Sequence, residues 1–213
     1  MTMTKIRAVV FDMDGVLIDA KDWHYEALNR ALNLFGYNIT RMEHLTTFDG
    51  LPTRKKLEML TLERGLPAGL HTFLNDLKQL YTTELIHSRC KPTFAHEYAL
   101  SRLREAGYKL AVASNSVRAT VELMMERSWL KPYLDVLLSN QDVAKAKPDP
   151  EMYRTAAAKL GLEPKECLVV EDNPNGIRAA EAAGCPVLVV GSVHDVHLAN
   201  IRDAIARAEG GAL

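Results

Sequence analysis

The chain lacks most features of secreted, membrane-spanning and nucleic-acid-binding proteins. Its three cysteines, Cys90, Cys167 and Cys185, are odd in number and far apart, and none belongs to a CxxC pair. This argues against a disulfide framework and a structural zinc site, so we expect a reducing, cytoplasmic setting. Lys and Arg number 26 against 27 Asp and Glu, so no excess of one charge favours nucleic acid or an anionic membrane as a partner. Residues 1 to 20 mix charges with a short apolar stretch, and we expect neither a signal peptide nor a membrane span there.

Valine is absent from one long part of the chain. None occurs between Val16 and Val112, where Leu, Ala, Glu, Lys and Arg dominate instead and favour helices. Apolar residues in this part recur at spacings of three and four, which is typical of amphipathic helices. One set is Leu28, Ala31, Leu32 and Phe35, and the other is Leu70, Phe73, Leu74, Leu77, Leu80, Tyr81 and Leu85. We interpret residues 20 to 91 as a helical insertion, too long for a plain crossover, that could act as a lid.

Short apolar runs alternate with helix-like stretches in the rest of the chain. With 213 residues and 47% hydrophobic content, the chain can bury a full core. The alternation predicts an α/β fold with a buried, doubly wound parallel sheet, formed by residues 1–19 and 92–213. The expected strands are Ala8–Phe11, Leu110–Ala113, Val136–Leu138, Leu168–Val170 and Val187–Val190, and the expected helices are Glu97–Ala106, Val117–Glu126, Pro150–Leu160 and Gly176–Ala183. Ile201, Ala204 and Ile205 indicate a last helix packed on the sheet.

The stretch VVFDMDGVLID places two carboxylates directly after the first predicted strand. Asp12 and Asp14 are two positions apart, so in extended chain they project to the same side. Like charges this close raise the pKa of one member unless a cation neutralises them, which predicts a metal ion, a shared proton, or both. The alternative is a turn in which Asp14 and Gly15 simply end the strand.

Polar clusters also follow three other predicted strands, at the edge where open α/β sheets bind their ligands. They are Ser114, Asn115 and Ser116 after the second strand, Lys145 and Lys147 after the third, and Glu171 and Asp172 after the fourth. The serine hydroxyl and the backbone amides that follow could bind phosphate oxygens at a helix start or could form an ordinary N-cap. A lysine in such a loop could offset the charge of a phosphoryl group or could simply be solvated. The acids could bind a cation or could interact favourably with the dipole at the start of a helix. Together, the clusters favour a divalent cation and a phosphate over an apolar ligand.

The segments DMDG, ASNS, KPDP and EDNPNG, in this order and with a helical insertion after the first, resemble the four motifs of the haloacid dehalogenase superfamily. The resemblance covers nearly the whole chain and is to the phosphatase and phosphomutase branch with a small helical cap. It implies a core of residues 1–19 and 92–213 and a cap of residues 20–91. It also implies an Mg²⁺-dependent phosphatase that hydrolyses a small phosphorylated metabolite, such as a sugar phosphate, through an aspartyl phosphate.

The resemblance also implies roles for individual residues. Asp12 would be the nucleophile, and Asp14 the general acid and then the base that activates water. Ser114 and Lys147 would hold the phosphoryl oxygens, with Lys147 preferred to Lys145 because it directly precedes a proline. Charge neutralisation and positioning of this kind are the main requirements of phosphoryl transfer.

The magnesium ligands implied by the resemblance come from both ends of the sequence. They are Asp12, the backbone carbonyl of Asp14, and Asp172, with Glu171 either a ligand or one water further out. Their oxygens are the hard donors that Mg²⁺ prefers.

Candidate substrate contacts are His24, Gly50, Arg54 and Asn115. The resemblance suggests that His24 touches the general acid, although a packed surface histidine is an equally open explanation. Basic residues at the start of a helix oppose its dipole unless an anion is near, so we expect Arg54 to contact substrate. For Lys55 and Lys56 a solvated basic face is the favoured explanation.

Other activities remain as alternatives. β-Phosphoglucomutase-like relatives carry a lysine just before the cap glycine, where this chain has Asp49, which disfavours a mutase. Dehalogenases do not need Asp14, and nothing near the cap lysines suggests the Schiff base of a phosphonatase. A non-catalytic receiver-like module that binds Mg²⁺ would not need Lys147 or a long cap. We read His194 and His197 as surface residues and expect a monomer.

Overall fold

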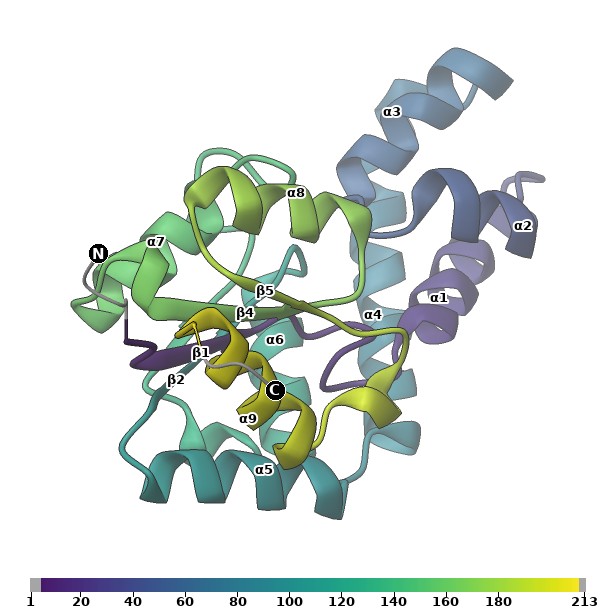
Figure 1. The fold of residues 1–213 in the computed structure, drawn as a ribbon. Coiled ribbons are helices and arrows are strands. Elements are labelled where there is room, and N and C mark those ends of the chain that lie inside the picture. The colour runs from purple at the N-terminus through teal and green to yellow at the C-terminus, as the bar shows by residue number, and fades with distance from the viewer. Residues whose placement is uncertain (1–4, 211–213) are drawn as a thin grey trace. The chain divides into compact units, whose positions relative to one another are not determined.

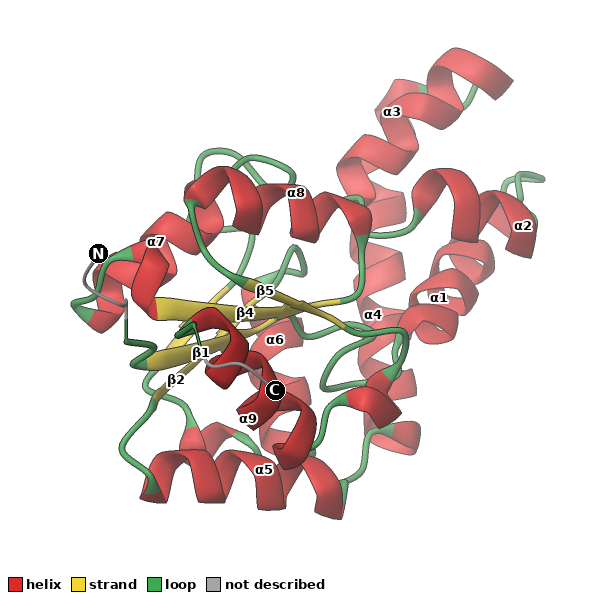
Figure 2. Cartoon of the chain, in the orientation of Figure 1, coloured by secondary structure: helices red, strands yellow, loops and turns green. Residues whose placement is uncertain are grey.

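The computed structural model describes residues 5–210. The chain forms two compact units: residues Ala20–Cys90 make up one, which we call the helical unit, and the described residues up to Asp19 and from Lys91 make up the other, the core unit. All the strands of the described chain belong to the core unit, and the helical unit consists of helices and loops (Figure 2). Within residues 5–210, every helix is too short or too polar to cross a bilayer.

The core unit is built on a parallel sheet with the strand order β3-β2-β1-β4-β5. The strands are β1 (Ala8–Phe11), β2 (Lys109–Ala113), β3 (Val136–Leu138), β4 (Cys167–Glu171) and β5 (Val187–Val189). The central strand β1 is buried at every position, as its uninterrupted apolar sequence requires in a sheet covered on both faces. The prediction of a doubly wound α/β fold is confirmed.

Helices cover both faces of this sheet (Figure 1). On one face lie α5 (Phe94–Glu105) and α9 (Leu198–Ala208), and on the other lie α7 (Glu151–Leu160) and α8 (Pro174–Ala183). The remaining helices of the unit are α6 (Arg118–Arg127), η3 (Lys131–Tyr133), η4 (Pro164–Glu166) and η5 (Val193–Asp195). The predicted last helix is α9, which buries Ile201, Ala204 and Ile205.

Small side chains allow α7 and α8 to approach the sheet closely. Ala156 and Ala157 on α7 and Ala179 and Ala180 on α8 are buried in one apolar cluster with β1, β2 and β4. Both helices end at a glycine with positive φ, which is the C-terminal signal that the sequence carries. Helix α5 begins at Phe94, three residues before the predicted start, because Phe94 and Ala95 are exposed and the buried residue of this turn is the polar His96, so the turn leaves no apolar pattern.

The helical unit has a small apolar core of its own. Its elements are α1 (Lys21–Asn33), α2 (Arg41–Glu43), η1 (His44–Phe48), α3 (Thr53–Arg64), η2 (Ala68–Leu70) and α4 (His71–Arg89). Helices α1 and α4 pack together, and Leu28, Leu32 and Leu74 are among the residues buried between elements of the unit. Phe73 and Leu80, which the sequence pattern placed on the apolar face of α4, are instead more than half exposed.

Candidate active site

The register of the sheet brings two of the predicted acids side by side. Phe11 of β1 lies level with Val170 of β4, so the next residues, Asp12 and Glu171, meet at the carboxyl edge. The backbone N–H of Asp12 continues the ladder by donating to the carbonyl of Val170 over 2.9 Å. Two acids 159 positions apart in the sequence therefore share one edge of the sheet.

Lys147 bridges these two acids. Its ammonium lies 2.6 Å from Oδ1 of Asp12 and 2.7 Å from Oε1 of Glu171, and all three side chains are buried. Lys145 is exposed and lies 3.9 Å from Asp149. The geometry therefore brings Lys147, rather than Lys145, to the carboxylates. A buried lysine is tolerated here because two carboxylates compensate its charge.

Glu171 accepts hydrogen bonds through both of its carboxylate oxygens. Oε1 accepts from Lys147 and from the hydroxyl of Tyr153, which is 2.7 Å away. Oε2 accepts from the backbone N–H groups of Asp172 and Asn173 over 3.0 and 3.1 Å. Four donors therefore fix the position of this carboxylate at the start of the loop that leads into α8.

Tyr153 is a residue of the site that the sequence analysis missed. It lies on the sheet-facing side of α7 and is 1% exposed. Burial raises the pKa of its hydroxyl well above the usual value, and the negative charge of Glu171 adds to this effect, so the group stays a donor. The only signal in the sequence is a tyrosine on an apolar helix face, whose hydroxyl needs a buried acceptor.

Three of the predicted metal ligands lie together. Asp12, Glu171 and Asp172 each offer a carboxylate oxygen, and these atoms lie within 4.8 Å of one another. This donor set fits Mg²⁺, which binds oxygen ligands and especially carboxylates. Burial raises the pKa of Asp12 well above its usual range although the charge of Lys147 acts in the opposite direction. A divalent cation beside it would favour the ionised form. Asp14 lies outside this group, and its carbonyl as a ligand stays a prediction.

The turn after Asp12 places Asp14 next to the loop that follows β2. Gly15 adopts φ 92°, a left-handed conformation that glycine adopts without strain, and its N–H donates to the carbonyl of Ile18. The hydroxyl of Ser116 donates to Oδ2 of Asp14 over 2.9 Å. The first and second polar clusters are therefore joined by a hydrogen bond to the predicted general acid.

Ser114 is buried at the end of β2. Its hydroxyl accepts from the backbone N–H of Ser116 over 3.0 Å, and its own N–H donates to the carbonyl of Leu138. Helix α6 begins only at Arg118, and its N-cap residue is Val117. The explanation of Ser114 as an ordinary N-cap is therefore wrong, and its role toward phosphoryl oxygens stays a prediction.

Asn115 holds the backbone of Lys147. Its Oδ1 accepts from the N–H of Lys147 over 3.0 Å, and its Nδ2 donates to the carbonyl of the same residue over 3.2 Å. This paired contact positions the lysine from the loop after β2, a structural role that the sequence analysis did not foresee. A substrate contact for Asn115 stays a prediction.

The other candidate substrate contacts belong to the helical unit. Nδ1 of His24 lies 3.3 Å from the ammonium of Lys78, a group that can only donate, so Nδ1 is the acceptor. The guanidinium of Arg54 is 3.0 Å from Glu58, and its side chain is 89% exposed. Gly50 adopts φ 70°. Their roles toward substrate stay predictions.

Lys55 and Lys56 differ in their surroundings although they are neighbours at the start of α3. Lys55 is exposed, in agreement with a solvated basic face. Lys56 is only 7% exposed, so the same explanation is wrong for this residue. The helix turns Lys56 toward the side that also carries the buried Leu57 and Leu60.

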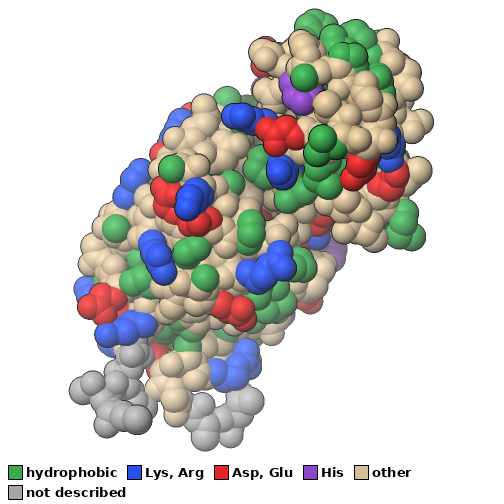
Figure 3. Space-filling model, turned by 90° about the horizontal axis from the view of Figure 1, so that it is seen from above, with side chains coloured by type: hydrophobic (Ala, Val, Ile, Leu, Met, Phe, Trp, Pro, Cys, Tyr) green, Lys and Arg blue, Asp and Glu red, His purple; other side chains and the backbone are tan. Residues whose placement is uncertain are grey.

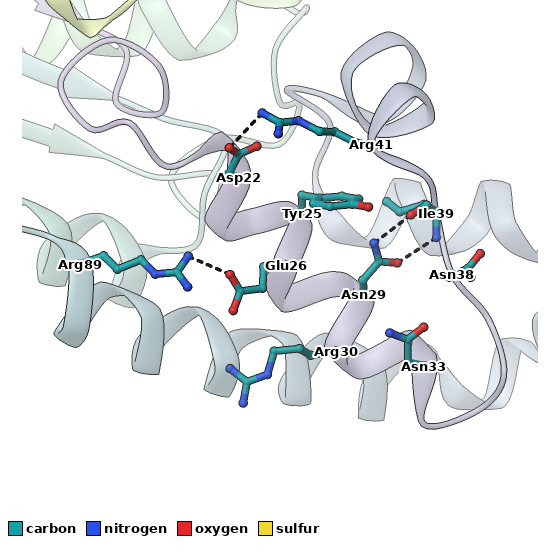
Figure 4. Close-up of a pocket in the computed structure, with 10 residues that line it drawn as sticks. All are labelled: Asp22, Tyr25, Glu26, Asn29, Arg30, Asn33, Asn38, Ile39, Arg41 and Arg89. Carbon is teal, nitrogen blue, oxygen red and sulfur yellow. Dashed lines mark hydrogen bonds and ion pairs between the residues drawn. The ribbon is translucent and has the colours of Figure 1, made fainter.

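A pocket of about 580 Å³ lies on the helical unit, and the predicted contacts are not among its lining residues (Figure 4). The ten residues that line it include Asp22, Glu26, Arg41 and Arg89, which form two ion pairs, Arg41 with Asp22 and Arg89 with Glu26. Arg30, the third arginine that lines the pocket, is paired with Glu84, so each of these arginines already has a carboxylate partner.

Charges of both signs are mixed on the surface of the molecule. On the face of the molecule in Figure 3, Lys and Arg side chains are interspersed with Asp and Glu. This agrees with the net charge of -1. A preference for an anion would therefore have to come from local groups such as Lys147.

The fold and the acidic edge of the sheet define a class, the α/β proteins whose ligands bind at the carboxyl ends of parallel strands. A model of the family described as haloacid dehalogenase-like hydrolase matches residues 9–190, and the chain belongs to this family. This confirms the resemblance seen in the four motifs. The match runs from β1 through β5 and includes the helical unit.

Named relatives are similar along most of the chain. A phosphorylated carbohydrates phosphatase of Thermotoga maritima is 30% identical over 211 residues, which cover 98% of this chain and 93% of the relative. The pyrophosphatase PpaX of Bacillus velezensis is 27% identical over 194 residues, covering 86% and 82%. The crystal structure of a β-phosphoglucomutase from Clostridium difficile matches with a TM-score of 0.82 at 21% identity, covering 95% of this chain and 98% of that one. At that identity the match shows the fold alone.

Proposed function

We propose that the protein is an Mg²⁺-dependent phosphatase that hydrolyses a small phosphate monoester through an aspartyl phosphate on Asp12. The observation that carries the proposal is the position of the Lys147 ammonium, 2.6 Å from Asp12 and 2.7 Å from Glu171, two acids whose carboxylate oxygens cluster within 4.8 Å with one of Asp172. A nucleophilic carboxylate, a cation for the phosphoryl oxygens and a set of oxygen ligands for a metal ion meet in one place. This combination suits phosphoryl transfer.

In the first step an oxygen of Asp12 attacks phosphorus, and the bond from phosphorus to the leaving oxygen breaks. Asp14 gives its proton to that oxygen, so the product leaves as a neutral alcohol. In the second step Asp14 takes a proton from water, the water oxygen attacks phosphorus, and the bond from phosphorus to Asp12 breaks. Inorganic phosphate is released and both aspartates return to their starting states.

The other residues of the site hold charge in place during these steps. Lys147 contacts Asp12 and is positioned to compensate the charge of the phosphoryl oxygens. Ser116 orients the carboxylate of Asp14 through its hydroxyl. Asp12, Asp172 and the carbonyl of Asp14 would hold Mg²⁺, whose chemistry is to neutralise phosphoryl charge. Glu171, whose oxygens already accept four hydrogen bonds, serves mainly to hold Lys147.

The substrate we propose is a phosphorylated carbohydrate. The support is the relative from Thermotoga maritima, a phosphorylated carbohydrates phosphatase that matches 98% of this chain. We assign the helical unit, Ala20–Cys90, the role of a cap that selects the substrate. His24, Gly50 and Arg54 are its candidate contacts, in line with the general role of closing elements in excluding water from the reaction.

The experiment is phosphate release from an aryl phosphate and from a panel of sugar phosphates, nucleotides and phospho-acids, each with and without Mg²⁺. The proposal expects Mg²⁺-dependent release, with the highest kcat/KM among sugar phosphates. A binding module would release no phosphate from any of these compounds. Conversion of a hexose 1-phosphate without release, in the presence of a bisphosphate, would instead identify a mutase.

A further inference from the structure

The hydroxyl of Tyr153 has no part in the proposed reaction, yet it lies inside the site. It donates to Oε1 of Glu171 over 2.7 Å, the same oxygen that accepts from Lys147. The ring of Tyr153 also lies beside the lysine, with the ammonium 4.7 Å from the ring centroid. One tyrosine therefore touches both members of the buried ion pair.

The two donors on Oε1 come from different parts of the chain. Tyr153 is on α7, which is packed against the sheet, and Lys147 is in the loop before that helix. The donors on Oε2 are two backbone N–H groups at the start of the following loop. Without the tyrosine, Oε1 would accept from Lys147 alone, and the lysine would be drawn more strongly toward Glu171 and away from Asp12.

We propose that Tyr153 is a positioning residue, which fixes Glu171 and thereby keeps the ammonium of Lys147 directed at Asp12. The inference rests on the proposed phosphatase function and assigns to this site a residue that does not touch the substrate. Tyr153 orients Glu171 by a hydrogen bond, just as residues that do not touch a metal ion orient the ligands that do.

The test is the variant Tyr153→Phe, which fills the same space and removes only the hydroxyl. We expect kcat for an aryl phosphate to fall roughly tenfold, the lower end of what is lost when such supporting hydrogen bonds are removed. KM should change by less than about twofold, because Lys147 keeps its charge and the enzyme still binds the substrate in its ground state. A purely structural hydroxyl would lower the melting temperature and leave kcat at 25 °C unchanged, and that result would overturn the proposal.

Tyr133→Phe is the matched control. Tyr133 also donates its hydroxyl to a glutamate, Glu97, over 3.2 Å, but on the α5 side of the core unit and not at the carboxylate cluster. Its removal should leave kcat within about twofold of wild type, as expected for a substitution away from the site. An equal loss of kcat in both variants would also contradict the proposed role.

A double-mutant cycle with Glu171→Gln identifies the path of the effect. If Tyr153 acts through Glu171, the hydroxyl should matter much less once the carboxylate is gone, so the two effects on kcat should be non-additive. Fully additive effects would refute action through Glu171. Absence of phosphatase activity in the wild-type protein would instead refute the proposed function, so the two failures are distinguishable.

Discussion

Gly176 leaves room for the carboxylate of Glu171. A Cβ atom at this position would lie 1.6 Å from Oε1 and 2.0 Å from Cδ of the glutamate, distances that no real side chain tolerates. The backbone of α8 thus approaches Glu171 as closely as only glycine allows. The segment NPNG, which forms the N-cap and first turn of α8, ends in this glycine for a spatial reason.

We expect Gly176→Ala to displace Glu171 and, with it, Lys147. Phosphate release should fall by at least roughly tenfold, since a small shift of positioning groups has large kinetic effects. Gly69→Ala is the control, because a Cβ there meets no atom within 4 Å. Equal activity of the two variants would show that the position of Glu171 does not matter.

Lys147→Met should destabilise the fold as well as abolish turnover. The variant leaves Asp12 and Glu171 buried together without their shared cation, and breaking a buried pair in this way costs about 3 kcal/mol or more. Lys145→Met removes an exposed lysine of the same loop and should cost under about 1 kcal/mol. Urea unfolding of both variants measures the difference. Similar free energies of unfolding would contradict the buried role of Lys147.

Mg²⁺ should stabilise the protein through the carboxylate cluster. A ligand that binds only the folded state raises stability by about 2.7 kcal/mol at one hundred times its Kd, so the melting temperature should rise with Mg²⁺ concentration. Asp172→Asn removes one of the clustered oxygens and should weaken this response. Asp203→Asn, an exposed acid on α9, should keep it. An undiminished response in Asp172→Asn would place the ion elsewhere.

His44 should make stability depend on pH. Burial, together with the charge of Lys56, lowers the pKa of this histidine from 6.5 to about 4. Between these values the unfolded chain binds a proton that the folded chain does not, so stability falls as pH decreases from 6.5 toward 4. At pH 5 the loss should be about 1–2 kcal/mol relative to pH 7. Urea unfolding of His44→Phe should show a smaller loss of stability between pH 7 and pH 5. An unchanged dependence of the free energy of unfolding on pH would assign the loss to other groups.

The sequence carried enough information for the sheet and its acidic edge. Strands β1 and β3 have the predicted bounds because short apolar runs between polar clusters have few alternatives in a parallel sheet. Asp12 and Glu171 could be predicted to lie near one another because parallel strands align their carboxyl ends. Family motifs add to this prediction, but the sheet topology alone would bring these acids together.

Other features depended on packing that a sequence pattern does not contain. Lys55 and Lys56 are identical neighbours, and only the orientation of α3 makes one exposed and the other buried. Phe73 lies on the expected stripe of α4 but remains exposed, with its ring edge-on to Phe35. The hydroxyl of Tyr153 reaches Glu171 because α7 packs across the sheet, a contact fixed by tertiary structure.

The most direct test of the account is to locate the phosphoryl group during turnover. In Asp14→Asn an aryl phosphate should still react, because its leaving group needs little protonation, while the lost base slows hydrolysis of the intermediate. Mass spectrometry of the quenched, digested variant should then find one added phosphoryl group on the peptide that contains Asp12. If the wild type turns over but the Asp12 peptide of the variant carries no phosphoryl group, nucleophilic attack by Asp12 is contradicted. A phosphoryl group on another residue of the variant would contradict it as well.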